Sequence, residues 1–147
     1  MAEKIIATNK KAFHDYTISE TLEVGIKLTG PEVKSIKAGS VSLKESFVHI
    51  ENGELFIKNL HIAHYKFSPK VGYDPIRNRK LLANKKEIMN LMGKLNQKGL
   101  SIIPTKIYLK NGLIKLEIGV AKGKKKWDKR EASKKKDLKR EMKKGMI

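Results

Sequence analysis

Residues 14–28 read HDYTISETLEVGIKL, and apolar and polar side chains alternate along them. Successive side chains of a β-strand point to opposite faces, so this pattern predicts one long strand with a buried face and a solvent face. The buried face would carry Tyr16, Ile18, Leu22, Val24, Ile26 and Leu28, and the outer face Asp15, Thr17, Ser19, Thr21, Glu23 and Lys27. Gly25 lies in the outward register, where a missing side chain permits the sharp bend or bulge that a closing barrel needs.

Two Asn-Gly pairs on either side of the chain's centre predict β-hairpins. Asn52-Gly53 lies within residues 47–62, and Asn111-Gly112 lies in a second alternating segment. A two-residue turn fixes which residues of the two strands face each other. The expected pairs are Val48 with Ile57, His49 with Phe56, Ile50 with Leu55, Lys106 with Glu117, Ile107 with Leu116, Tyr108 with Lys115, and Leu109 with Ile114. The polar outer face of the second hairpin is a candidate docking surface.

Two segments predict helices. A short helix begins at Thr29-Gly30-Pro31-Glu32 and stops at Gly39, because proline suits the first turn and glycine the end. A long helix begins at the capping box Asn84-Lys85-Lys86-Glu87 and continues toward Gly99. Its apolar positions recur at helical spacing: Ile88, Leu91, Met92 and Leu95.

These elements predict a mostly β, α+β fold. Long antiparallel strands with a glycine bend favour a small closed barrel with one long and one short helix outside it. Alternation alone does not distinguish a closed barrel from an open sheet. We expect one barrel domain over residues 1–120 and a basic tail over residues 121–147.

The tail is distinguished by its charge. Residues 121–147 contain 13 Lys and Arg against 4 Asp and Glu, within a 147-residue chain of net charge +18. The tail has too few apolar groups to bury the surface that would order it. We therefore expect it to be disordered when free and to become ordered when it binds a polyanion. The basic balance indicates nucleic acid first, and an acidic membrane surface or acidic protein second. The start of the chain has no apolar run typical of a signal peptide or membrane span, which predicts a cytoplasmic protein without a membrane partner.

The sequence offers no constellation typical of an enzyme. His61 and His64 are an odd number of residues apart on an expected strand, so they would point to opposite faces and could not share a metal ion. The chain has no cysteine, and no clustered carboxylates suggest a nuclease. We expect neither a metal nor a cofactor.

Three groups of residues are candidates for RNA contacts, each with a plainer alternative. Asn9, Lys10 and His14 form a polar, cationic cluster, which is either an RNA contact or structural. Arg77, Arg79 and Lys80 lie in a basic loop over residues 66–80 and are either a solvated charge run or a phosphate-binding patch. Trp127 either stacks on a base or packs back on the barrel.

Four motifs in order resemble the small protein B family, the transfer-messenger-RNA-binding proteins of bacterial trans-translation. The motifs are NKKAFHDY at residues 9–16, GPEVKS at 30–35, RNRKLL at 77–82, and GVAKGKK at 119–125 followed by DKR at 128–130. The resemblance spans nearly the whole chain. It implies a closed antiparallel barrel similar to an oligonucleotide-binding fold.

The resemblance also implies partners. The barrel would bind the tRNA-like domain of transfer-messenger RNA, and the tail would enter the empty messenger channel of a stalled ribosome and become helical against small-subunit rRNA. Elongation factor Tu would be an indirect partner through the shared RNA. The alternatives are a ribosomal structural or assembly protein that binds rRNA and, from another class, a nuclease.

The resemblance assigns roles residue by residue. Those implied for RNA binding by the core are Glu23, Leu82 and Asn84, with Asn9, Lys10 and His14 beside them; Arg77, Arg79, Lys80, Lys122, Lys124 and Lys125 complete our expected RNA-binding set. Those implied for the decoding centre are Trp127, Asp128, Lys129 and Arg130. Asn84 has a competing role as a helix cap and Leu82 as a packing residue. A carboxylate near phosphates is costly, so we expect Glu23 to accept hydrogen bonds from a base or ribose, or to orient a lysine.

Overall fold

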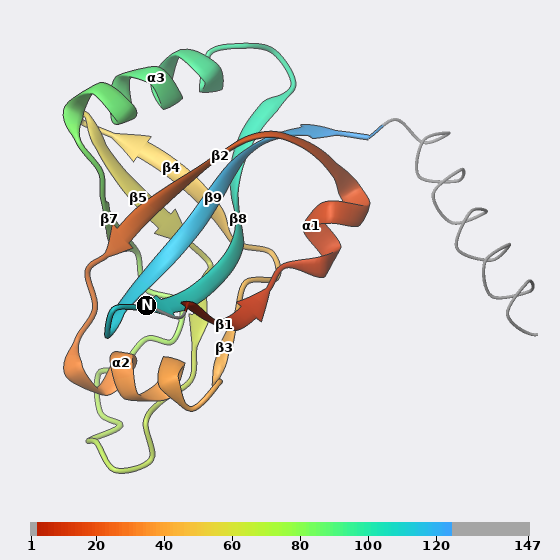
Figure 1. The fold of residues 1–147 in the computed structure, drawn as a ribbon. Helices are drawn as coiled ribbons and strands as arrows, with labels where there is room; N and C mark the ends of the chain where they lie inside the picture. Colours follow the sequence, from red (N-terminus) through yellow and green to blue (C-terminus); the bar gives the residue numbers. More distant parts are fainter. Residues whose placement is uncertain (1–2, 125–147) are drawn as a thin grey trace, which may run out of the picture.

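The computed structural model describes residues 3–124 (Figure 1), so every prediction for residues 125–147 lies outside the described residues. The elements in order are β1 (Glu3–Thr8), α1 (Lys10–Asp15), β2 (Tyr16–Ile26), α2 (Gly30–Lys37), β3 (Val41–Ser42), β4 (Phe47–Glu51), β5 (Glu54–Lys58), β6 (His61–Ile62), β7 (Arg79–Leu82), α3 (Lys85–Leu95), β8 (Leu100–Lys110) and β9 (Leu113–Gly123). Seven strands form one antiparallel sheet, and β3 pairs with β6 separately. None of the described helices has the length and apolar character needed to span a bilayer.

The two hairpin registers are confirmed. Every predicted pair of the β4–β5 and β8–β9 hairpins is a Cα pair of the structure. Asn52, Gly53, Asn111 and Gly112 all have positive φ, which the two-residue turns of twisted hairpins require. Asparagine and glycine reach this backbone region at low cost, so these two turns fix the register locally.

The prediction of a closed barrel is wrong. The strand order is β1-β8-β9-β2-β7-β5-β4, and within residues 3–124 the outermost strands β1 and β4 do not pair with each other. A barrel closes only when its first and last strands share a ladder. Alternation within each strand tells which face is buried but not which edges meet, so the sequence could not show that this sheet stays open.

The long strand β2 contains a bulge that the alternation did not predict. Its ladder with β9 pairs Ile18 with Ala121 but Glu20 with Val120, so Ser19 is the extra residue. The bulge reverses the faces: Ile18 packs in a small cluster under α1, whereas Leu22 packs in the main core. The expectation of a single buried face is therefore wrong for the first part of the strand, and residues 14 and 15 belong to α1. Helix α1 is six residues long, too short to show an apolar period.

Gly25 has a different role from the expected barrel bend. It pairs with both Leu82 of β7 and Lys115 of β9, so it lies where β2 exchanges one neighbour for the other. A Cβ atom at Gly25 would lie 3.3 Å from the Cβ of Leu82. The absent side chain therefore leaves room for Leu82 to lie over the outer face of the sheet.

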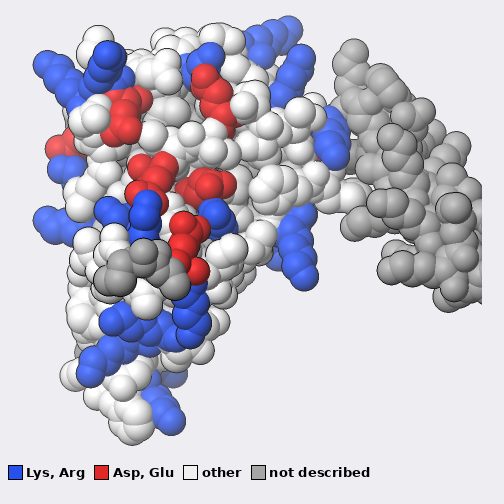
Figure 2. Space-filling view, viewed as in Figure 1, with Lys and Arg blue, Asp and Glu red and all other residues white. Residues whose placement is uncertain are grey.

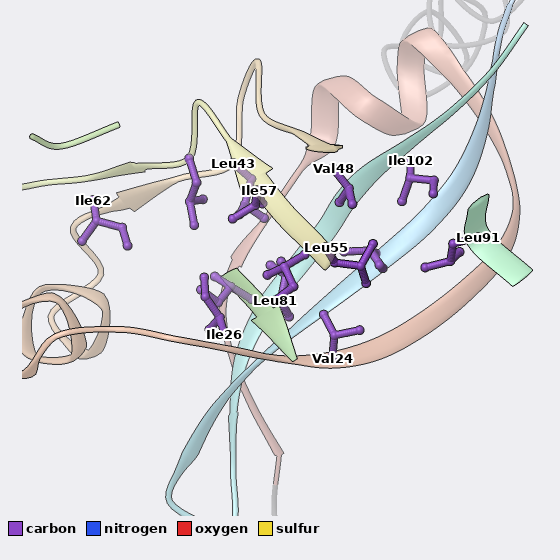
Figure 3. Close-up of a cluster of buried hydrophobic side chains, with 14 of the residues drawn as sticks. Val24, Ile26, Leu43, Val48, Leu55, Ile57, Ile62, Leu81, Leu91 and Ile102 are labelled. Atoms are coloured by element: carbon purple, nitrogen blue, oxygen red, sulfur yellow. The ribbon is translucent and has the colours of Figure 1, made fainter. Parts of the chain in front are cut away.

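One main core lies between the folded-over sheet and its covering elements (Figure 3). Leu55, Ile57 and Leu116 have no exposed surface, and α3 contributes Leu91. The capping box predicted at Asn84 with Glu87 is present, and the helix start predicted at Thr29 carries a second one, with Glu32, that was not predicted. The capping boxes fix where α2 and α3 begin. They therefore fix where the chain leaves β2 and β7, the strands that precede these helices and carry part of the candidate site.

Candidate nucleic-acid interface

Glu23 is the centre of a hydrogen-bonded cluster on the outer face of β2, β9 and β8. The Tyr108 hydroxyl donates to Glu23 Oε1 over 2.5 Å, and Lys110 Nζ donates to the same oxygen over 3.2 Å. Tyr108 is nearly buried and Glu23 is exposed. Within residues 3–124 Glu23 Oε2 accepts no hydrogen bond. The cluster holds one carboxylate oxygen in place and presents the other to solvent.

The cluster keeps Glu23 ionised. The hydrogen bond from Tyr108, with Lys110 adding to it, lowers the pKa of the Glu23 carboxyl. Burial, followed by the bond to Glu23, raises the pKa of the Tyr108 phenol. Tyr108 therefore stays protonated and donates, and Glu23 stays an acceptor, at every physiological pH.

Leu82 and Asn84 continue this face. Leu82 is 53% exposed and lies against Gly25, two residues along β2 from Glu23 and on the same face. It lines a shallow hollow of about 280 Å³ together with Leu113 and Lys115. Asn84 follows two residues later and accepts the Glu87 N–H over 2.8 Å as the cap of α3. Its capping role is confirmed, and its Nδ2 makes no hydrogen bond within residues 3–124.

Charges of both signs are interleaved over this face. Figure 2 shows acidic side chains flanked by lysines and arginines over the strands that Figure 1 places in front. Lys106 pairs with Glu3 over 3.2 Å and with Glu117 over 3.8 Å, and Thr105 donates to Glu117 over 2.7 Å. The face therefore offers fixed acceptors as well as cations, which suits base and ribose groups better than a uniform phosphate surface does.

The predicted cluster at residues 9–14 lies on α1. Asn9 is buried: its Nδ2 donates to the Pro104 carbonyl over 2.9 Å, and its Oδ1 accepts the Ala12 N–H at the start of α1. Lys10 is exposed, and His14 Nδ1 lies 3.0 Å from Asp15 Oδ1. Asn9 thus shapes the helix, whereas Lys10 and His14 face outward.

The end of β9 brings two further predicted lysines to α1. Lys124 Nζ donates to the Phe13 carbonyl over 3.2 Å, and its backbone N–H donates to the Asp15 carbonyl over 3.0 Å. Lys122 is exposed on the same strand end. We call Lys10, His14, Lys122 and Lys124 the α1 cluster. It lies at the opposite end of the β2–β9 ladder from Gly25, roughly 30 Å away at about 3.3 Å per residue. Lys125, Trp127, Asp128, Lys129 and Arg130 lie outside the described residues.

Arg79 is not part of any exposed face. Residues 79–82 form β7 rather than the end of a loop, and the Arg79 side chain has no exposed surface. Its Nε donates to Glu32 Oε2 over 2.7 Å, and its Nη1 donates to the Leu60 carbonyl over 2.7 Å. Its Nη2 lies 3.1 Å from the Pro75 carbonyl. The guanidinium therefore joins α2 to the loop after β6 and has no donor left for RNA.

Arg77 shares the same carboxylate. Its Nη2 donates to Glu32 Oε1 over 2.6 Å and its Nε to Oε2 over 3.1 Å, with 37% of its side chain exposed. Lys80 points outward and pairs with Glu54 over 3.3 Å. The three predicted cations are therefore divided: Arg79 is internal, Arg77 lies at the surface of the buried network, and Lys80 is exposed.

Glu32 stays ionised although it is buried. Burial would raise the pKa of its carboxyl, but hydrogen bonds from Arg77, the Thr29 N–H and Arg79 outweigh burial and lower the pKa from 4.5 to about 2. The position of Glu32 at the start of a helix was predicted; its pairing with two arginines more than 40 residues away was not.

Two residues of the Glu23 cluster, Tyr108 and Lys110, were not predicted as site residues from the sequence. Tyr108 was placed on the outer hairpin face, but its bond to Glu23 crosses the intervening strand β9. Lys110 lay at the end of the same strand. An aromatic residue on a charged outer face was the available signal for Tyr108. Across residues 3–124 no three His, Asp or Glu side chains converge as metal ligands.

Comparison with known proteins gives one consistent family. A model of the family described as SmpB protein matches residues 6–147. The SsrA-binding protein of Persephonella marina is 60% identical over 144 residues, 98% of this chain and 95% of the relative. The SsrA-binding protein of Geobacter sulfurreducens is 55% identical over 142 residues, 97% of this chain and 93% of the relative.

A solved structure agrees with these relatives. It is described as "tmRNA-SmpB: a journey to the center of the bacterial ribosome", with 48% sequence identity and a TM-score of 0.69, and the match covers 82% of this chain and 85% of that one. The resemblance read from the four sequence motifs is confirmed. This chain belongs to the SmpB protein family.

Proposed function

We propose that this chain is an RNA-binding adaptor of trans-translation that recognises the tRNA-like domain of transfer-messenger RNA and brings it to stalled ribosomes. Membership of the SmpB family supports this, as do relatives named SsrA-binding proteins that match almost end to end. The observation that carries it is the match over 98% of the chain to such a relative. A net charge of +18 supplies the attraction to phosphates.

The Glu23 face is the proposed contact with the tRNA-like domain. Glu23 Oε2 would accept hydrogen bonds from a base or ribose, because Tyr108 and Lys110 hold the other oxygen. Leu82 would pack on an apolar edge of the RNA, and the amide nitrogen of Asn84 would donate. Lys80 lies on the same strand as Leu82 and would bind a phosphate. Arg77 is partly exposed at the edge of the Glu32 network, so only its exposed part would contact RNA.

The α1 cluster is a second proposed RNA contact of the domain, and the tail is the proposed contact with the ribosome. Lys10, His14, Lys122 and Lys124 lie where the described chain ends, so the tail leaves the domain from this cluster. Trp127, Asp128, Lys129 and Arg130 would act in the decoding centre. No step of this function needs catalysis or a cofactor, and its place is the cytoplasm, where ribosomes work.

A binding titration tests the proposal with the complete chain. The dissociation constant for the tRNA-like domain should rise with salt, with a log–log slope of about 0.9 per neutralised phosphate. The same RNA should dominate the sequences that co-purify from native cells. Salt-insensitive binding, or co-purification of only rRNA at fixed stoichiometry, would contradict the proposal and favour a ribosomal structural protein.

A second experiment separates RNA binding from rescue. Replacing Asp128, Lys129 and Arg130 together by alanine should leave affinity for the tRNA-like domain almost unchanged and abolish tagging of stalled peptides. Equal loss of both activities would show that the tail is a general RNA anchor. The variant keeps the full chain, which matters because residues 121–123 belong to β9 and cannot be deleted without harming the sheet.

A further inference from the structure

The loop between β6 and β7 exposes apolar side chains without a use in the core. Phe67 is 75% exposed and Val71 is 96% exposed. The Phe67 ring meets the half-buried Tyr65 ring edge-on, with centroids 5.4 Å apart. In Figure 1 this loop protrudes beyond α2, at the end of the molecule opposite α3. It is therefore separate from the α1 cluster.

The loop is held by specific hydrogen bonds. The Ser68 N–H and hydroxyl both donate to the Tyr65 carbonyl, over 3.0 and 2.9 Å, and His64 Nε2 lies 2.7 Å from the Ser68 carbonyl. At its base Tyr73 donates to the Ile62 carbonyl over 2.6 Å. Together with the Arg79 bond to the Pro75 carbonyl described above, these bonds present the rings on a fixed support.

Lysines surround the two rings. Lys34 Nζ lies 5.7 Å from the Tyr65 ring centroid, and Lys66 Nζ lies 4.8 Å from that of Phe67. Lys70 follows in the same loop. Within residues 3–124 none of these three lysines forms an ion pair, and the nearby Asp74 carboxylate accepts the Ile76 N–H. Asp74 keeps its charge, so three lysines stand against one carboxylate and the surroundings of the rings are net positive.

We propose that the exposed Phe67 ring, supported edge-on by Tyr65, is a stacking platform for an unpaired RNA base, whose flanking phosphates are bound by Lys34, Lys66 and Lys70. Aromatic rings interleaved with cations are the arrangement that binds single-stranded nucleic acid. One exposed ring is too small an apolar area for a stable protein partner, whereas it matches the face of a single base. This goes beyond the proposed function, because the ligand is an unpaired base and the site is not the Glu23 face.

The test uses the full chain with Trp127→Leu as the parent, which removes the only tryptophan of the sequence. The probe is a U-rich single-stranded RNA 12-mer with one central 2-aminopurine, whose fluorescence falls when it stacks. The variants are Phe67→Leu, which keeps an apolar group without the ring, Phe67→Tyr, which restores a ring, and Val71→Ala as a matched exposed control. Because Phe67 is exposed, the unfolding midpoint should be the same in all four proteins.

The parent and Phe67→Tyr should quench the probe, and Phe67→Leu should lose the quenching and bind at least about fivefold more weakly. Val71→Ala should behave like the parent. Unchanged quenching in Phe67→Leu, an equal loss in Val71→Ala, or a Phe67-dependent affinity for anionic lipid vesicles in place of RNA would overturn the inference. Affinity for the tRNA-like domain, measured in parallel, reports separately on the proposed function and should not change in Phe67→Leu.

Discussion

Glu23 and Glu32 are two carboxylates with similar partners and opposite surroundings. Glu32 accepts hydrogen bonds from Arg77, Arg79 and the backbone, and its side chain has no exposed surface. Glu23 accepts from Tyr108 and Lys110, and 37% of its side chain is exposed. Both oxygens of the enclosed Glu32 carboxylate accept hydrogen bonds, so it has none left to offer a ligand and it shapes the fold. Glu23 Oε2 accepts no hydrogen bond within residues 3–124, so Glu23 can bind a ligand.

The largest expected effect comes from breaking the buried cluster. Arg79→Ala leaves the Glu32 charge without its internal partner, so the free energy of unfolding should fall by about 3–5 kcal/mol in a urea titration. Lys80→Ala is the matched control, because Lys80 is the next residue, exposed and paired with Glu54. It should cost at most about 1 kcal/mol. Similar losses in both variants would contradict the division between internal and surface cations.

Acid should weaken the buried cluster as well. The folded pKa of Glu32 is lowered from 4.5 to about 2, so its contribution is complete above pH 4.5 and is lost as the pH falls toward 2. The loss should reach about 3 kcal/mol of unfolding free energy. Carboxyl-carbon NMR gives the Glu32 titration midpoint directly. A midpoint near 4.5 would mean that the two arginines do not hold this charge.

Apolar contact on the exposed face should have a moderate effect. Leu82→Ala keeps the Cβ atom over Gly25 but removes the exposed part of the side chain, so affinity for the tRNA-like domain should fall roughly fivefold. Met89 on α3 is more exposed than Leu82, at 63% against 53%, and Met89→Ala should leave affinity unchanged. Isothermal titration of both variants checks this. The same loss in both would show that the contact is not specific to the Leu82 side of the sheet.

The smallest effect should follow from Tyr108→Phe. The substitution keeps the buried ring and removes only the hydroxyl that orients Glu23, so affinity for the tRNA-like domain should fall about threefold. Removing that bond should also bring the pKa of Glu23 closer to its ordinary value. If the affinity falls as far as it does on removing Glu23 itself, Tyr108 contacts the RNA rather than positioning the carboxylate.

Local signals in the sequence were sufficient for some elements and not for others. The Asn-Gly turns predicted both hairpin registers, Pro31 in the first turn predicted the start of α2, and the capping box at Asn84 predicted the start of α3. The bulge at Ser19 was missed although it had a signal: Ser19, Glu20 and Thr21 are three polar residues in a row, which interrupts the alternation at this point. Closure of the sheet failed as a prediction for a different reason: it depends on how edges distant in sequence meet, and no local pattern reports that.

The candidate site shows the same limit. Arg77-Asn78-Arg79-Lys80 resembled a surface patch, because its charges are adjacent in sequence and the partner Glu32 lies 47 residues from Arg79. β7 is four residues long and carries a buried arginine, so no apolar alternation marked it as a strand. The resemblance placed Glu23, Leu82 and Asn84 in one functional group, and the structure brings them to one face. It could not show that Tyr108 holds Glu23.

The most direct test compares Glu23→Ala with Glu54→Ala in filter binding to the tRNA-like domain. Both residues are exposed carboxylates paired with one lysine, at 3.2 and 3.3 Å, so both variants raise the net charge of a basic protein equally. Charge alone would strengthen binding to RNA in both. We expect Glu23→Ala to weaken binding by roughly tenfold or more and Glu54→Ala to leave it equal or tighter. Equal or tighter binding by Glu23→Ala would contradict the assignment of this face as the RNA interface.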